Sequence, residues 1–113
     1  MPVPLYQAKA ELFRTLGHPV RIRVLELLQE RPKAVRELLL DLDIEPSNLS
    51  QQLAVLRRAG IVTSTREGTA VVYALAASDV AELMQAARRF LTEVLADRGE
   101  LLAELQRAAS EAR

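Results

Sequence analysis

The spacing of apolar residues changes twice along this chain, and these changes restrict its fold more than any other feature. Up to Gly60, apolar residues recur every three or four positions, as on the buried face of a helix. Residues 61–66 and 70–75 are instead rich in β-branched residues, and Glu67-Gly68 between them is typical of a turn. The helical spacing returns from Ser78. The sequence therefore predicts a mainly α fold with one β-hairpin.

Four helices are expected before the hairpin. Their approximate ranges are residues 4–16, 19–31, 34–42 and 46–59. Pro19 and Pro46 suit the first helical position, where the N–H that proline lacks would have no partner within the helix. Gly17 is expected to end the first helix. Gly60 suits the left-handed conformation that commonly closes a helix. The hairpin, about residues 61–76, follows directly.

The fourth expected helix has one apolar face and one polar face. Leu49, Leu53 and Leu56 share a single stripe. The other positions of its first two turns carry short neutral donors and acceptors: Ser47, Asn48, Ser50, Gln51 and Gln52. Side chains of this kind can meet base edges in the major groove of DNA, and Arg57 in the last turn can meet phosphates. A solvated surface helix carries similar residues, so the neighbouring segments must decide between the two interpretations.

Composition excludes several classes of protein. The 113 residues suffice for one domain and include no cysteine, which excludes disulfides, thiol redox sensing and thiolate metal sites. There are 15 basic and 15 acidic residues, so a general polyanion binder is not indicated. One histidine and no Gly-rich phosphate loop argue against an enzyme. Neither an export signal nor a membrane span is recognisable, so a cytoplasmic protein without a membrane partner is expected.

The C-terminal segment, about residues 78–112, is expected to be a long helix that needs a partner. Its apolar residues follow a heptad, the pattern of helices packed lengthwise. Arg98-Gly99 offers a break, because glycine costs about 1 kcal/mol in a helix interior. We expect the heptad face and the first helix to form a dimer interface. The residues assigned to this interface are Leu5, Leu12, Phe13, Met84, Ala87, Leu91 and Val94.

Three motifs resemble those of one protein family. Residues 16–25, Leu-Gly-His-Pro-Val-Arg-Ile-Arg-Val-Leu, resemble the second-helix motif of the ArsR/SmtB family of bacterial repressors. Residues 50–62 are similar to its recognition helix running into the wing. Arg66-Glu67-Gly68 and Tyr73-Ala74-Leu75 are similar to its wing hairpin. The resemblance extends over about residues 8–95 and implies a winged helix-turn-helix fold.

The resemblance also implies a function. Members of this family are homodimers that pair through their first and last helices, place two recognition helices in successive major grooves of double-stranded DNA, and usually leave the DNA when an effector binds. The positions that match DNA contacts are Ser47, Asn48, Ser50, Gln51, Gln52, Arg57, Arg66 and Gly68. Thr69 and Ala74 stand where family wings often carry basic residues, so this wing should attract phosphates less strongly.

The familiar metal sites of the family are not expected here. Leu39 and Asp41 stand where the third helix would carry cysteines, and Ala81 replaces the histidine that would follow Asp79 by two positions. We therefore predict no cofactor. His18 is expected to cap or pack the start of the second helix, although an atypical site holding nickel or zinc through nitrogen and oxygen ligands stays open at this point.

Two alternatives to a DNA-binding repressor stay open as well. One is a metal sensor with such an atypical site. The other is a winged-helix module that has lost DNA binding and whose terminal helix recruits another regulatory protein; the neutral net charge is compatible with it.

Overall fold

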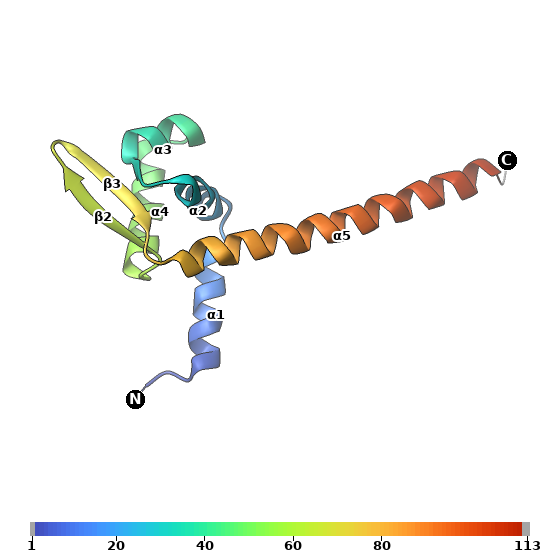
Figure 1. Ribbon diagram of the computed structural model, residues 1–113, viewed down its shortest axis with the longest axis horizontal. Coiled ribbons are helices and arrows are strands. Elements are labelled where there is room, and N and C mark those ends of the chain that lie inside the picture. Colours follow the sequence, from blue (N-terminus) through green and yellow to red (C-terminus); the bar gives the residue numbers. More distant parts are fainter. Residues whose placement is uncertain (1, 112–113) are drawn as a thin grey trace. The chain divides into compact units, whose positions relative to one another are not determined.

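The computed structural model describes residues 2–111, and its elements follow the expected order (Figure 1). The bounds are α1 Leu5–Leu16, α2 Pro19–Glu30, β1 Lys33–Ala34, α3 Val35–Leu42, α4 Pro46–Arg58, β2 Val62–Glu67, β3 Ala70–Leu75 and α5 Ser78–Glu111. Helices α2, α3 and α4 followed by the β2–β3 hairpin form a winged helix-turn-helix, which confirms the predicted fold class.

Helix ends are set by local chemistry, as the sequence predicts. The backbone N–H of Val20 donates to Nδ1 of His18 at 3.2 Å, so His18 caps α2 and Pro19 opens it. This confirms the structural role expected of His18. Gly60 follows α4 with φ of 75°, in the left-handed region that favours glycine.

The core lies between α2, α3, α4 and the base of the wing. Its most deeply buried large side chains are Val24, Leu25, Leu38, Leu49, Leu53, Leu56 and Val62. The predicted stripe of α4, Leu49, Leu53 and Leu56, is therefore entirely interior. Each such side chain contributes about 1.5–3 kcal/mol by leaving water, so α4 is held firmly by its apolar face while its opposite face stays free.

The sheet contains one strand more than the predicted hairpin. Strand β3 lies in the middle, paired antiparallel with β2 on one side and with β1 on the other. Lys33 is opposite Tyr73, and Ala34 is opposite Val72. A strand of two residues has no measurable apolar alternation, which is why the sequence did not reveal β1.

The described residues divide into two compact units, with the boundary between Ala81 and Glu82. The first contains the winged helix-turn-helix and the second contains most of α5. Helix α5 runs unbroken through Gly99, so the break offered by Arg98-Gly99 does not occur. Its 34 residues span roughly 50 Å at ~1.5 Å per residue. Within residues 2–111, no helix is long and apolar enough to cross a membrane.

Candidate nucleic-acid interface

The outward face of α4 carries part of the predicted reading surface. Ser47, Ser50 and Gln51 are exposed, and Asn48 is half-buried. Gln52 is only 8% exposed. This placement corrects the prediction that Gln52 reads a base, because almost none of its surface remains to meet one.

A chain of hydrogen bonds explains why Gln52 is interior. Arg21 of α2 donates through Nε to Oε1 of Gln52 at 2.8 Å and through Nη1 to the carbonyl oxygen of Thr15 at 3.0 Å. Gln52 in turn donates through Nε2 to Oδ1 of Asn48 at 3.0 Å. Arg21 is half-buried and joins the end of α1 to α4.

The C-terminal turn of α4 is basic. Arg57 and Arg58 are both exposed, and α4 contains no acidic residue. Two cations at a helix C-terminus are stabilised by the partial negative charge of the last carbonyl groups. Because both side chains are exposed, they can also meet a phosphate. The exposed face of α4 therefore runs from short polar side chains at its start to positive charge at its end.

The wing is a tight hairpin beside this helix. Its two-residue loop is Gly68-Thr69, and Gly68 has φ of 63°, a conformation that favours glycine at the first position of such a loop. Arg66 is exposed on β2 and lies opposite Val71 of β3. Gly68 is thus explained by backbone geometry alone, while Arg66 is the exposed basic side chain of the hairpin.

The turn between α3 and α4 begins with a left-handed residue, and α3 itself forms an ion pair with the segment before it. Asp43 closes α3 in the left-handed conformation, with φ of 51°. Arg31 pairs with Glu37, whose carboxylate also accepts the N–H of Ala34 at 3.4 Å. The hydrogen bond from Arg31, followed by that from the Ala34 backbone, lowers the pKa of Glu37.

Lys33, a buried residue of β1, forms the second part of this ion-pair network. Its Nζ lies 3.0 Å from Oε2 of Glu30 and 3.6 Å from Oδ2 of Asp41. The hydrogen bond with Glu30 raises the pKa of Lys33, and the same bond lowers the pKa of Glu30. Asp41, at a position of the family's thiolate site, is thus engaged in an ion pair.

The residues assigned to the dimer interface differ in how exposed they are. Leu5, Leu12, Phe13, Ala87 and Leu91 are exposed, and Val94 is half-buried. Met84 is only 8% exposed, so it leaves little surface for a partner.

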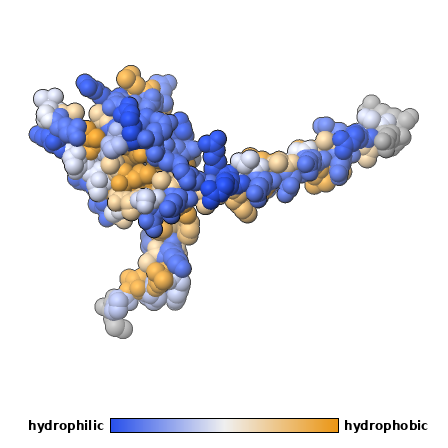
Figure 2. Space-filling view, in the orientation of Figure 1, coloured by the Kyte–Doolittle hydropathy of each residue, from blue (hydrophilic) through white to orange (hydrophobic). Residues whose placement is uncertain are grey.

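Sequence reasoning also missed exposed apolar residues on α5. These are Phe90, Leu95 and Leu102. They lie beside the predicted heptad positions, so a wider apolar stripe, rather than a strict heptad, would have found them. Figure 2 shows hydrophobic residues along α1 and along one edge of α5.

Metal ligands do not gather in the part of the chain that the structure describes. It contains no group of three or more His, Asp or Glu side chains placed to hold a metal ion. Leu39, at the other position of the family's thiolate site, instead lines an apolar groove of about 390 Å³ between α3 and β3.

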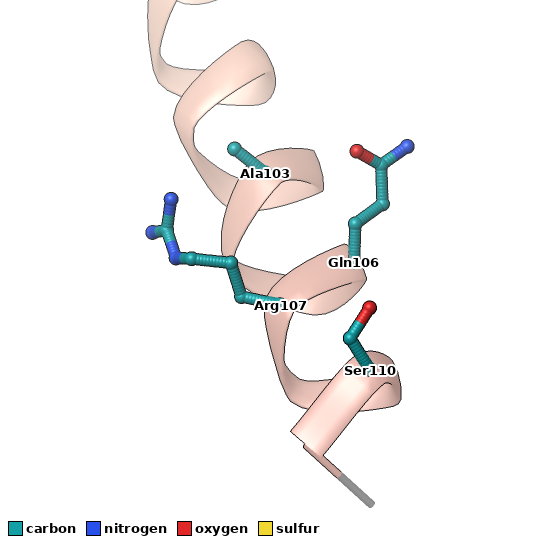
Figure 3. Close-up of a pocket in the computed structure, with 4 residues that line it drawn as sticks. All are labelled: Ala103, Gln106, Arg107 and Ser110. Atoms are coloured by element: carbon teal, nitrogen blue, oxygen red, sulfur yellow. The ribbon is translucent and has the colours of Figure 1, made fainter. Parts of the chain in front are cut away.

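A recess on α5 is not a ligand site. It is lined by Ala103, Gln106, Arg107 and Ser110, which project from successive turns of one helix (Figure 3). A single exposed helix face has no opposing wall to enclose a small molecule.

Comparisons with known proteins agree with this geometry. The model of the family "bacterial regulatory protein, arsR family" matches residues 18–64. The uncharacterised HTH-type transcriptional regulator Rv0081 of Mycobacterium tuberculosis is 56% identical over 108 residues, which cover 95% of each chain. The biofilm growth-associated repressor of Agrobacterium fabrum is 40% identical over 90 residues, which cover 76% of this chain and 77% of that protein.

Solved structures give the same result. The crystal structure of Rv0081 has a TM-score of 0.79 at 58% identity and covers 86% of this chain and 98% of its own. The solution structure of the homodimeric winged helix-turn-helix DNA-binding domain of Mb0332 from Mycobacterium bovis has a TM-score of 0.75 at 28% identity, covering 80% and 84%. The members of this family are transcriptional regulators and not enzymes. The chain belongs to the ArsR/SmtB family of winged helix-turn-helix transcriptional regulators.

Proposed function

We propose that this protein is a sequence-specific repressor that acts in the cytoplasm and binds an inverted-repeat operator as a homodimer. The observation that carries the proposal is the exposed face of α4, where Ser47, Ser50 and Gln51 precede Arg57 and Arg58. This face combines groups that can read base edges with groups that can hold phosphates. The repressor role is supported by the relative from Agrobacterium fabrum, which is named a repressor.

The homodimer is supported by apolar side chains that a single copy leaves in water. Leu5 is 69% exposed, Phe13 57% and Leu91 54%. The relative Mb0332 is described as homodimeric. Two copies of α4 related by a two-fold axis would meet half-sites about one DNA turn apart, roughly 34–36 Å.

The test is binding of wild-type protein and three variants to the promoter region of its own gene and to a scrambled duplex, across a salt series. Gln51→Ala should cost about 1–3 kcal/mol on the specific duplex and relax preference at one base pair. Arg57→Ala should weaken binding to both duplexes and lower the salt slope by about 1. Arg23→Ala is the matched control, because Arg23 is an exposed arginine of α2 that pairs with Glu26 and does not belong to α4.

Two results would count against the proposal. If Gln51→Ala and Arg57→Ala bind both duplexes as wild type does, α4 is not a recognition helix. If wild type binds no duplex in preference to another, the protein is better understood as an interaction module that recruits another regulatory protein.

A further inference from the structure

In the hydrogen bonds that link Arg21, Gln52 and Asn48, the chemistry of the groups determines which atom donates and which accepts. An amide group has an oxygen and a nitrogen of nearly the same shape, so either could face a given neighbour. A guanidinium group has only N–H donors. Because Nε of Arg21 lies 2.8 Å from the side-chain amide of Gln52, the atom facing it must be the oxygen of that amide.

The orientation of the Gln52 amide in turn determines the orientation of the Asn48 amide. With its oxygen turned to Arg21, Gln52 has only its NH₂ group for Asn48, at 3.0 Å. A donor at that distance requires an acceptor, so Asn48 must turn its carbonyl oxygen inward. Its NH₂ group then faces away from Gln52.

The NH₂ group of Asn48 is available at the surface of α4. The structure gives it no hydrogen-bond partner among residues 2–111. In the same part of the chain, no fully buried side-chain nitrogen or oxygen lacks a partner, so this nitrogen reaches solvent. Asn48 lies in the first turn of α4, next to exposed Ser47 and one turn before exposed Gln51.

We propose that Arg21 and Gln52 are positioning residues that make Asn48 a hydrogen-bond donor toward DNA, so that Asn48 selects guanine rather than adenine in the operator. This inference rests on the proposed function. The usual contact of asparagine with adenine is bidentate and needs both amide atoms, the oxygen for N6 and the nitrogen for N7. Here the oxygen is turned toward Gln52, and the outward NH₂ matches O6 and N7 of guanine, which both accept.

The test is selection of binding sites from a randomised duplex library, followed by affinities for duplexes that differ at one position. Wild type should prefer guanine at the position that Asn48→Ala no longer discriminates. Gln52→Glu keeps an oxygen that accepts from Arg21, but its second oxygen presents an acceptor to Asn48. The Asn48 amide must then rotate by about 180° so that its NH₂ donates to Glu. Its oxygen then faces the DNA. Preference at that position should shift toward adenine or cytosine, with the affinity ratio changing about tenfold, the value of one hydrogen bond.

A second variant does not depend on the buried network being rebuilt. Asn48→Asp keeps an acceptor for Gln52 and offers only acceptors to DNA, and an acidic residue in the first turn of α4 favours helix formation. Its added charge lowers affinity for every duplex. The readout is therefore the ratio of the affinity for a duplex with guanine at this position to that for a duplex with cytosine, because a uniform loss cancels in this ratio. This ratio should fall about tenfold. In Arg21→Gln, the new side chain can donate to or accept from Gln52, so the amide of Gln52 can adopt either orientation. This variant should therefore bind duplexes with guanine or adenine at this position about equally.

The outcomes separate this inference from the proposed function. If wild type enriches no sequence, both fail. If wild type enriches a sequence but Gln52→Glu and Asn48→Asp, each folded by circular dichroism, keep its base preference at every position, the donor role of Asn48 is wrong and the recognition role of α4 stands. A shift at one position in both variants supports the inference, because a merely structural network would change affinity without changing the base preferred.

Discussion

Two neighbouring glutamines of α4 have the same side chain and different surroundings. Gln51 is exposed, whereas Gln52 is buried and bonded to Arg21 and Asn48. Adjacent positions on a helix point about 100° apart, so one step along the chain separates the surface from the interior. At this scale the role of a residue depends on the partner it meets and not on its chemical type.

The two glutamines should therefore differ in their effect on stability. Gln52→Ala leaves the half-buried guanidinium of Arg21 without one partner, and we expect the free energy of unfolding to fall by about 1–3 kcal/mol. Gln51→Ala, the matched control on the exposed face, should stay within about 0.5 kcal/mol of wild type. Urea unfolding followed by circular dichroism measures both. Equal losses for the two variants would contradict the buried role of Gln52.

At the scale of elements, α3 is held against α2 and β1 by charged groups as well as by its apolar face. Arg31 and Lys33 together engage Glu30, Glu37 and Asp41. The Arg31–Glu37 and Lys33–Asp41 pairs link α3, the short helix that precedes α4, to the end of α2 and to β1.

These pairs predict how stability depends on pH. The pKa of Glu37 is lowered from its ordinary value of 4.5, so its contribution is present above about pH 4.5 and is lost as pH falls through the lowered value. The raised pKa of Lys33 has the opposite sign: its contribution is present below about pH 10.5 and is lost as pH rises through the raised value. Thermal unfolding across pH should show lower midpoints at both extremes.

Glu37→Gln isolates the acidic part of this dependence. The variant should unfold at lower temperature than wild type at pH 7 and lose less on further acidification, because the group that titrates is gone. Glu67→Gln is the control, since Glu67 is exposed on the wing and makes no ion pair within residues 2–111. An acid profile of Glu37→Gln that parallels wild type would show that the Arg31–Glu37 pair contributes nothing to the pH dependence.

At the scale of the whole molecule, a single copy leaves much apolar surface in water. Leu91 is one of several exposed leucines of α5, which has roughly 50 Å of length to cover. Leu91→Glu would put a charge into the proposed interface at a cost of several kcal/mol, and should give monomers or unfolded chain. Gln85→Glu, at an exposed polar position of the same helix, should leave the assembly unchanged. Sedimentation measures both, and a wild type that is monomeric at micromolar concentration would refute the interface.

The operator affinity of the protein should also be unaffected by the effectors that are familiar in its family. The chain has no thiol, Leu39 and Asp41 occupy the cysteine positions, and Ala81 occupies the histidine position. Oxidants and arsenite should therefore leave operator affinity unchanged, and zinc or cobalt should change it little. Gel shifts with each reagent provide the measurement. A tenfold or larger loss of affinity with one equivalent of a divalent metal would point instead to a nitrogen and oxygen site, with His18 as the first residue to replace.

Features that depend on local spacing could be predicted from the amino-acid sequence. The apolar stripe of Leu49, Leu53 and Leu56 identified α4 and its buried face, because helical periodicity needs no knowledge of the partner surface. The cap at His18 and the left-handed closure at Gly60 were predicted in the same way, since each is set within a few residues of chain.

Which polar and apolar side chains remain exposed depends on contacts between segments that are distant in the chain. Gln52 became interior because Arg21, 31 positions earlier, reaches it, and no local pattern encodes that meeting. The pairing of β1 with β3 is of the same kind. Helical spacing tells which residues share a face, but the extent to which each is covered depends on segments distant in the chain.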